Sequence, residues 1–478
     1  MSHILFVAAE GLPFVKTGGL ADVIGSLPNA LYKEGYSVSV VMPLYLSVVK
    51  SKKQSLTKLA SFMVRVGILN SIASVYGTQI DGIQYYLIEH QGYYEREGYY
   101  GYPDDGERFA FFNHAVLRMI EEKICEPDVI HSHDWHAGLI SLLAKTFYKD
   151  RIKPVLTIFT IHNLYFQGNY PRSLLGACIG LSESYYDDGS LRFKDGISFM
   201  KAGILYSDLV TTVSSTYAKE ILTPEFGESM EEVLRLRQND LFGIVNGIDI
   251  DTWNPESDSA LLSNYSARTI KKAKVINKLA IQKELGLRQD AKVMLVAMVS
   301  RLTDQKGIWL LLQAMSDIMG WNIQLLILGT GDFYAESELH KIEYKYPQRA
   351  VFYCGYNEAL AHRIYAGADV LLMPSLFEPC GISQLIAMHY GTLPLVRETG
   401  GLKDTVDAYN QYTKKGTGFS FKAFNVDDFK KILWLALDTY TNRFDDFNLM
   451  VKQAMKKDVS WNKSAKSYSK LIKKRLPN

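Results

Sequence analysis

The sequence predicts an α/β fold made of two doubly wound domains, with the ligand site in the cleft between them. Three observations support this prediction. The chain has 478 residues, which is too many for one hydrophobic core and fits two or three domains. Short apolar runs alternate with helical patterns in both halves of the chain. Several of these runs end in polar or glycine-rich stretches, and loops at the carboxyl ends of parallel strands are where such sheets bind ligands.

The composition narrows the class of protein. The apolar content is 47% and the formal net charge is +2, so charge indicates neither nucleic acid nor a membrane surface as a partner. We expect no membrane span, because the chain lacks an apolar run of about 18 residues, and no secretion signal. The four cysteines form no C-x-x-C pair, which favours a reducing, cytoplasmic location over a disulfide frame or zinc knuckle.

The stretch from Gly11 to Leu31 organises the first half of the chain. It follows an apolar run that reads as a buried parallel strand, and it ends with the spacing of one helix face. Lys16, Gly18 and Gly19 lie between the two. A strand, a glycine loop and a helix in this order point backbone N–H groups at an anion, although the spacing matches neither nucleotide fingerprint. Pro28 should kink or end the helix.

The rest of the first half continues the alternation of strands and helices. We expect strands at 38–43, 128–131, 155–161, 209–214 and 241–245, an inserted hairpin region at 51–90 and a helix at 109–123. A tyrosine-rich loop follows the hairpin region and contains Tyr93, Tyr94, Tyr99, Tyr100 and Tyr102. These aromatic rings suit either stacking on sugars or packing on their own domain.

Polar residues follow two of these strands directly. The run from His131 to His136 contains three histidines and Asp134, and His162 with Asn163 follows the next strand. The histidines could bind a metal ion, but a fourth distant ligand is missing, so we favour a polar loop at the strand end. The D-x-D triplet at 249–251 could also bind a metal, but its turn-rich surroundings favour a linker.

The second half repeats the α/β pattern. We expect strands at 293–299, 323–328, 351–356, 369–373 and 393–396. The predicted domains are 1–248 and 249–460, with a C-terminal helix at 461–478 that packs back near the hinge. The basic charge of this last segment is typical of a solvated helix face.

Two cations flank the first strand end of the second half. Arg301 and Lys306 are five positions apart in a strand-to-helix loop, so they can reach one pair of phosphates together. A helix that begins near Gly381 can add backbone N–H donors. These groups would do the electrostatic work of a metal ion on a departing diphosphate.

Seven motifs along the whole chain carry a family resemblance. They are K-T-G-G-L-A-D at 16–22, H-D-W-H at 133–136, I-H-N at 161–163, V-N-G-I-D at 245–249, S-R-L-T-D-Q-K-G at 300–307, F-E-P-C-G at 377–381 and T-G-G-L at 399–402. The chain resembles bacterial glycogen synthases and plant starch synthases, which are retaining glucosyltransferases of the GT-B fold with two Rossmann-like domains. The resemblance implies transfer of glucose from ADP-glucose, or UDP-glucose, to the non-reducing end of an α-1,4-glucan, without a cofactor or metal.

The resemblance also implies roles for individual residues. Its catalytic residues are His162, Arg301, Lys306 and Glu378. Its substrate contacts are Lys16, Gly18, Gly19, Asp22, Asp134, Asn163, Asn246, Tyr356, Cys380 and Gly381. Arg301 and Lys306 would hold the diphosphate, Tyr356 would stack on the base, and Cys380 with Gly381 would cap the distal phosphate. His162, Asp134 and Asn246 would line the glucose, close to Glu378.

Several alternatives stay open from sequence. Many enzymes of this class carry a second glutamate eight positions after the first, but Ile386 stands there, so the ribose contact is unassigned. Retention could use a covalent intermediate or same-face attack assisted by the phosphate, and we favour the second because no nucleophile can be named. Another nucleotide-sugar enzyme, such as an epimerase, or a silent glucan-binding protein would share much of the pattern. The oligomeric state is undetermined.

Overall fold

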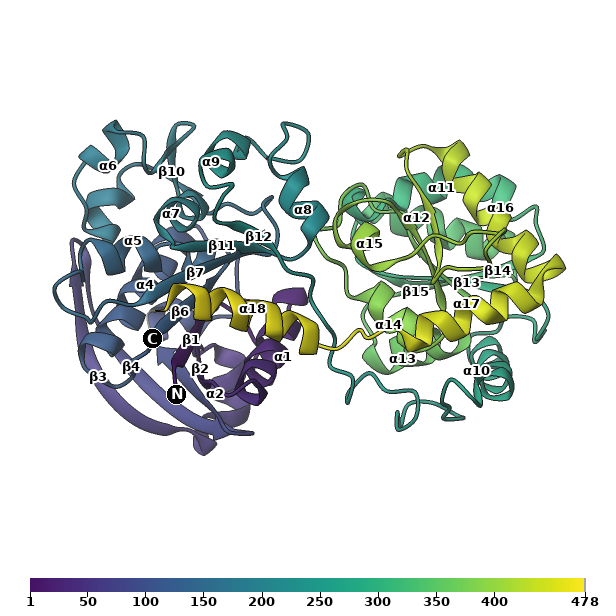
Figure 1. Cartoon of the computed structure of the whole chain (residues 1–478), viewed down its shortest axis with the longest axis horizontal. Helices are drawn as coiled ribbons and strands as arrows, with labels where there is room; N and C mark the ends of the chain where they lie inside the picture. The colour runs from purple at the N-terminus through teal and green to yellow at the C-terminus, as the bar shows by residue number, and fades with distance from the viewer. Residues whose placement is uncertain (477–478) are drawn as a thin grey trace. The chain divides into compact units, whose positions relative to one another are not determined.

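The computed structural model describes residues 1–476, and the chain divides into two compact units. Unit 1 comprises Met1–Asn246 together with the C-terminal segment that begins at Trp461, and unit 2 comprises Gly247–Ser460. Each unit has its own sheet, its own helices and its own hydrophobic core (Figure 1). No helix within residues 1–476 is long and apolar enough to span a bilayer.

The sheet of unit 1 has the strand order β12-β11-β7-β6-β1-β2-β5-β4-β3 in the described chain. Its strands are β1 (His3–Val7), β2 (Ser37–Pro43), β3 (Thr57–Val66), β4 (Leu69–Ile80), β5 (Ile83–Glu89), β6 (Val129–His133), β7 (Leu156–Ile161), β11 (Leu209–Thr212) and β12 (Leu241–Gly243). All neighbours pair in parallel except β3 with β4 and β4 with β5. The expected hairpin region therefore extends the main sheet through β5. The strand order reverses direction between β1 and β6, which is the switch point at which such sheets bind ligands.

The helices of unit 1 are α1 (Gly19–Lys33), α2 (Leu46–Lys52), α3 (Gln91–Tyr94), α4 (Asp105–Glu121), α5 (Ile140–Lys145), α6 (Ser184–Asp187), α7 (Phe199–Tyr206), α8 (Ser215–Glu220), α9 (Glu231–Leu236) and α18 (Asn462–Arg475). A small sheet joins β8 (Asn169–Tyr170), β10 (Gly196–Ser198) and β9 (Arg192–Phe193). Pro28 was expected to kink or end this helix, and of the two an end at Pro28 is wrong, because α1 continues to Lys33. Proline removes only one backbone donor, and the buried Leu27 and Leu31 anchor the helix on both sides of it.

The C-terminal helix α18 belongs to unit 1 and packs beside α1 (Figure 1). Oγ of Ser464 donates a hydrogen bond to the carbonyl of Val245 at 2.5 Å. The hydroxyl groups of Ser469 and Tyr36 lie 3.0 Å apart. The end of the chain thus completes the core of the unit in which the chain begins.

The tyrosine-rich loop packs on its own unit. Arg108 of α4 is fully buried, and its guanidinium donates to the carbonyl of Tyr93 at 2.8 Å. The ring of Tyr102 lies 4.9 Å from the same guanidinium, and the hydroxyl of Tyr94 donates to the Arg108 carbonyl at 2.9 Å. These tyrosines surround a buried cation, as the second of the two sequence readings predicts.

Unit 2 contains a fully parallel sheet with the order β15-β14-β13-β16-β17-β18. Its strands are β13 (Met294–Val299), β14 (Ile323–Gly329), β15 (Ala350–Cys354), β16 (Val370–Met373), β17 (Leu393–Arg397) and β18 (Phe419–Phe421). Its helices are α10 (Ile270–Glu284), α11 (Ile308–Ile318), α12 (Phe333–Lys345), α13 (Glu358–Gly367), α14 (Ser383–His389), α15 (Gly400–Thr405), α16 (Val426–Asn442) and α17 (Phe444–Lys456). The switch point lies between β13 and β16. The predicted α/β fold with two doubly wound units is therefore confirmed.

Candidate functional site

The loop between β1 and α1 presents the first predicted residues at the switch point of unit 1. Nζ of Lys16 lies 2.7 Å from Oδ1 of Asp22, so the first turn of α1 holds the lysine. Gly18 precedes the helix and Gly19 is its first residue, and both are exposed. The strand, glycine loop and helix expected from sequence are present, and they leave the backbone at Gly18 and Gly19 open to a ligand.

Glu10 is a buried carboxylate that the sequence interpretation overlooked. It lies just beyond β1 with 4% of its surface exposed, and it accepts a hydrogen bond from the backbone N–H of Thr17 at 2.6 Å. Burial raises the pKa of Glu10. The available signal for this residue was a charged side chain directly after a long apolar run, because acidic side chains are rarely buried unless they are paired. Glu10 shapes the loop that carries Lys16 and Gly18.

Asp134 connects the ends of β6 and β7. Its backbone has a φ of 55°, which is uncommon for a residue other than glycine and indicates a constrained position. Oδ1 accepts a hydrogen bond from the backbone N–H of His162 at 2.8 Å, and the N–H of Asp134 donates to Thr160 at 3.0 Å. Burial raises the pKa of Asp134 to about 7. Asp134 thus fixes the turn that contains His162 and Asn163.

The histidines of the run 131–136 contact other side chains singly. Nδ1 of His133 lies 2.9 Å from Nε2 of His162, whereas Nε2 of His131 lies 2.7 Å from the hydroxyl of Thr160. His136 packs flat on Trp135, with ring centroids 3.9 Å apart. No group of three or more His, Cys, Asp or Glu side chains within residues 1–476 is arranged to hold a metal ion. The run is a polar core segment at the strand end.

Unit 2 brings two predicted catalytic residues into contact. Nζ of Lys306, in the loop after β13, lies 2.6 Å from Oε2 of Glu378, in the loop after β16. Only 19% of the lysine side chain and 7% of the glutamate side chain are exposed. The hydroxyl of Ser375 donates to the same Oε2 at 3.1 Å. The pair therefore lies at the switch point of the second sheet, shielded from bulk water on most sides.

Glycines allow the loops around this pair to pack closely. Gly307 has a φ of 72°, and a Cβ there would lie 2.0 Å from the carbonyl oxygen of Pro374. Gly400 has a φ of 44°, and a Cβ there would lie 1.9 Å from the carbonyl oxygen of Glu378. Only glycine tolerates both the conformation and the contact. The loops after β13, β16 and β17 are thereby held against one another.

The other predicted residues of unit 2 range from exposed to buried. Arg301 is exposed, and its guanidinium makes no hydrogen bond or ion pair with residues 1–476. Cys380 is buried, and the side-chain amide of Gln384 donates to the carbonyls of Cys380 and Gly381 at 3.0 and 2.9 Å. Tyr356 is 72% exposed and follows β15, an edge strand that β14 separates from β13, and its hydroxyl donates to Glu358 at 2.8 Å.

The remaining candidates, Asn246 and the D-x-D triplet, lie on either side of the point in the chain where unit 1 ends and unit 2 begins. Asn246 is buried at the end of unit 1. Oδ1 of Asp249 accepts hydrogen bonds from the backbone N–H groups of Asp251 and Thr252 at 2.9 and 3.2 Å. The first carboxylate of the D-x-D triplet therefore caps a turn, as expected of a linker. Ile386 is 4% exposed and packs in the core of unit 2.

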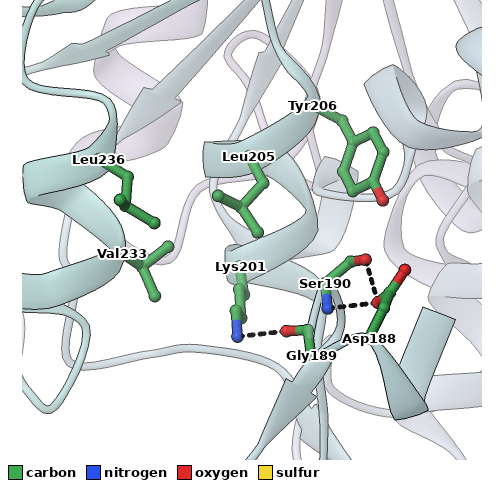
Figure 2. Close-up of a pocket in the computed structure, with 8 residues that line it drawn as sticks. All are labelled: Asp188, Gly189, Ser190, Lys201, Leu205, Tyr206, Val233 and Leu236. Atoms are coloured by element: carbon green, nitrogen blue, oxygen red, sulfur yellow. Dashed lines mark hydrogen bonds between the residues drawn. The ribbon is translucent and has the colours of Figure 1, made fainter.

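A cavity of about 410 Å³ lies in another part of unit 1 and contains none of the predicted residues (Figure 2). It is lined by Asp188, Gly189, Ser190, Lys201, Leu205, Tyr206, Val233 and Leu236. Nζ of Lys201 donates to the carbonyls of Gly189 and Arg192 at 2.7 and 2.8 Å, and Figure 2 shows the first of these bonds. The ammonium thus ties α7 to the segment 189–192. A second cavity of about 620 Å³, beside α12, also lies apart from the candidate residues.

Comparisons with known proteins match this arrangement. Residues 3–236 match the starch synthase catalytic domain model, and residues 278–448 match the model of glycosyl transferases group 1. The chain is 45% identical to a glycogen synthase of Desulforamulus reducens over 99% of both chains. It is 47% identical to a glycogen synthase of Clostridium perfringens over 98% of this chain and 97% of the relative.

Two solved structures are also similar to this chain over almost its whole length. The catalytic domain of starch synthase IV from Arabidopsis thaliana, bound to ADP and acarbose, has a TM-score of 0.90 and 31% identity, over 99% of both chains. Sucrose-phosphate synthase from Thermosynechococcus elongatus has a TM-score of 0.63 and 17% identity, over 99% of both chains, and shows the fold alone.

Proposed function

Because this chain belongs to the glycogen synthase and starch synthase family of GT-B glycosyltransferases, we propose that it transfers glucose from ADP-glucose to the non-reducing end of an α-1,4-glucan. The relatives are named glycogen synthases, and the similar starch synthase structure contains ADP and acarbose. UDP-glucose is the alternative donor. The observation that carries the proposal is the pairing of Lys306 with Glu378 at the switch point of unit 2.

The cations of unit 2 support a role in binding the departing diphosphate. Lys306 is held in place by a carboxylate before any ligand arrives, so its charge is preorganised. Arg301 has no ion pair with the described residues, so all five of its N–H donors remain for a ligand. In this proposal Cys380 and Gly381 contact the distal phosphate, and Tyr356 stacks on the base.

The polar residues of unit 1 support a role on the sugar side. His162 and Asn163 lie in a turn that Asp134 fixes, and Lys16 lies beside exposed backbone at Gly18 and Gly19. Oxygen and nitrogen atoms at the ends of β1, β6 and β7 suit the hydroxyl groups of a hexose. We assign the glucose contacts to these residues and to Asn246, and further contacts of the nucleotide sugar to Lys16 and Asp22.

The mechanism that fits unit 2 is same-face attack assisted by the leaving phosphate. Oε2 of Glu378 accepts hydrogen bonds from both Lys306 and Ser375, at 2.6 and 3.1 Å. A carboxylate oxygen engaged in this way is a weaker nucleophile, which supports an electrostatic role for Glu378. Chemical analysis of the new linkage tests whether the α configuration is retained.

A transfer assay tests the proposed function. Labelled ADP-glucose and UDP-glucose are supplied separately with glycogen, with and without a chelator. We expect label to enter glycogen from ADP-glucose, to depend on the acceptor, and to be insensitive to the chelator. Incorporation that is faster from UDP-glucose would reverse the donor assignment. Binding of glycogen without any incorporation would identify a silent glucan-binding protein, and inhibition by the chelator would restore a metal role for Asp249 and Asp251.

The cytoplasm is the proposed location. Cys125, Cys178, Cys354 and Cys380 are all free thiols. Unpaired cysteines are typical of proteins in a reducing compartment. A thiol titration of protein purified without reductant tests this, because four reactive thiols after denaturation are expected and a disulfide would contradict it.

A further inference from the structure

Two histidines in unit 1 share one hydrogen bond. Nδ1 of His133, the last residue of β6, lies 2.9 Å from Nε2 of His162, which follows β7. Their rings are 5.2 Å apart, centroid to centroid. Asp134 fixes the backbone of His162 from the other side, through the bond to its N–H. The position of the His162 ring is thus set by two consecutive residues at the end of one strand.

Burial favours the neutral form of both rings. His133 is fully buried against Phe6, with the two rings stacked at a centroid distance of 5.5 Å. Burial holds the pKa of His133 well below its ordinary value, and it lowers the pKa of His162 to about 3. A neutral imidazole carries one N–H and one unprotonated nitrogen, so the shared bond has two possible arrangements. In one His133 donates, and in the other His162 donates.

The surroundings of His133 distinguish the two arrangements. Its Nε2 is buried and has no hydrogen-bond partner within residues 1–476. If His162 donated, the proton of His133 would be on Nε2 and a buried N–H group would have no acceptor. If His133 donates from Nδ1, its Nε2 is an unprotonated nitrogen without a donor. Leaving a donor unsatisfied costs more than leaving a weak acceptor unsatisfied, so the second arrangement is favoured.

This arrangement determines which ring nitrogen of His162 carries its proton. When its Nε2 accepts the bond from His133, its only proton is on Nδ1. Nδ1 of His162 has no hydrogen-bond partner in the described chain and is not enclosed by the core. We infer that His133 is a positioning residue that fixes His162 as the Nδ1–H tautomer, so that His162 presents a neutral N–H donor to a hydroxyl oxygen of the bound sugar. This inference rests on the proposed function only for the identity of the acceptor.

His131 provides a matched control for His133. It lies on the same strand and the same face, two residues earlier, with its ring 4.2 Å from that of His133. It is also fully buried, but its hydrogen bond goes to Thr160 and not to His162. A leucine at either position perturbs the same core. Only the change at position 133 removes the donor to His162.

The tautomer is tested directly by nitrogen NMR on the full chain labelled with ¹⁵N-histidine. The signals of His162 are assigned by their loss in His162→Asn. We expect the protonated nitrogen of His162 to be Nδ1 in the parent chain and in His131→Leu, but not as a single species in His133→Leu. A protonated Nε2 on His162 in the parent chain would overturn the inference. This measurement needs no substrate, so it is independent of the transferase assay.

Steady-state kinetics test whether the N–H donor of His162 contributes to the reaction of the bound sugar. Asparagine places an amide nitrogen where histidine has Nδ1, so His133→Asn keeps the donor. We expect His133→Leu to lower kcat/KM by about tenfold, and His133→Asn to restore it to within about threefold. His131→Leu should match the parent kcat/KM at equal folded fraction. If His133→Asn is as impaired as His133→Leu while both remain folded, the donor role is wrong.

Discussion

The ammonium nitrogen of Lys306 and the carboxylate of Glu378 lie 2.6 Å apart, although 72 positions separate the two residues in the chain. The contact joins the loops that follow β13 and β16, the two strands on either side of the switch point. The pair is formed within unit 2 alone. Its cation is therefore held by side chains of the protein itself, which is the condition that electrostatic stabilisation of a leaving group requires.

Removal of the Lys306 charge should slow the reaction. We expect Lys306→Ala to lower turnover with ADP-glucose by about 10²–10³, the usual cost of one preorganised electrostatic group. Initial rates at saturating donor and glycogen measure this loss. The control is Lys430→Ala, because Lys430 also forms an ion pair, at 2.7 Å from Asp317, but away from the candidate residues. A loss of less than about fivefold in Lys306→Ala would contradict the role.

Arg301 should affect activity without affecting stability. Its guanidinium makes no hydrogen bond or ion pair within residues 1–476, so Arg301→Ala should change the free energy of unfolding by less than about 0.5 kcal/mol. The same variant should lower kcat/KM by about 10²–10³. The kcat/KM of Arg301→Lys should lie between those of the parent protein and Arg301→Ala, because an ammonium keeps the charge but cannot make the bidentate contact of a guanidinium. Denaturant unfolding and initial rates measure the two effects, and a parent-like kcat/KM in Arg301→Ala would exclude Arg301 from the site.

Gly400 should be intolerant of a side chain. A Cβ at this position would lie 1.9 Å from the carbonyl oxygen of Glu378, so Gly400→Ala must displace the loop that carries Glu378. Gly286→Ala is the matched control, because Gly286 has a φ of 72° but no atom within 4 Å of the added Cβ. We expect Gly400→Ala to destabilise unit 2 by about 1–3 kcal/mol more than Gly286→Ala, and to lower turnover. Equal free energies of unfolding in Gly400→Ala and Gly286→Ala would show that the loop of Glu378 moves away without loss of stability.

The buried histidines should make the stability of unit 1 depend on pH. Burial lowers the pKa of His114 to about 4, whereas an unfolded histidine titrates near 6.5. Between these values the unfolded chain binds the proton and the native chain does not, so stability falls as the pH falls from 6.5 to 4. Each such histidine contributes about 1.4 kcal/mol per pH unit in this window. The same sign applies to His131 and His136, whose pKa values are lowered to about 3 by burial.

His114→Gln isolates this effect. Glutamine retains a donor and an acceptor near the hydroxyl of Tyr148 and the carbonyl of Ile179 but does not titrate. We expect the slope of unfolding free energy against pH between 4 and 6.5 to decrease by about 1.4 kcal/mol per unit in this variant. Burial raises the pKa of Asp134 to about 7, which gives a slope of opposite sign, and this slope is common to both proteins. An unchanged slope in His114→Gln would mean that His114 is charged in the native state or unfolds locally.

Asp134 should be replaceable by asparagine but not by alanine. Asparagine has nearly the same shape as aspartate and retains an oxygen for the N–H of His162. We expect Asp134→Ala to destabilise unit 1 by about 1–3 kcal/mol, because a partly buried donor loses its acceptor in a constrained turn. Asp134→Asn should be close to the parent protein near pH 7. Thermal unfolding of the two variants compares them, and equal losses would show that charge, rather than the hydrogen bond, matters.

Local pattern in the sequence was sufficient for most of the secondary structure. Apolar runs predict β1, β7, β13 and β14 because a parallel strand covered on both faces needs nothing but apolar side chains. The glycine pair at 18–19 and the helix after it follow from spacing and from the absence of a Cβ. Of the kink or end predicted at Pro28, the end was wrong, because burial of the helix face outweighs one lost hydrogen bond.

The sequence by itself determined that the chain forms two doubly wound units and that polar loops lie at the strand ends. Only the tertiary structure decided which of these side chains meet: Lys306 with Glu378, and His133 with His162. It also showed Glu10 buried beneath the glycine loop, and the tyrosines gathered around Arg108. The physical reason is the separation in sequence of the residues that interact. Strand and helix patterns depend on neighbours in the chain, whereas ion pairs, tautomers and buried charges depend on which loops the strand order of the sheet brings together.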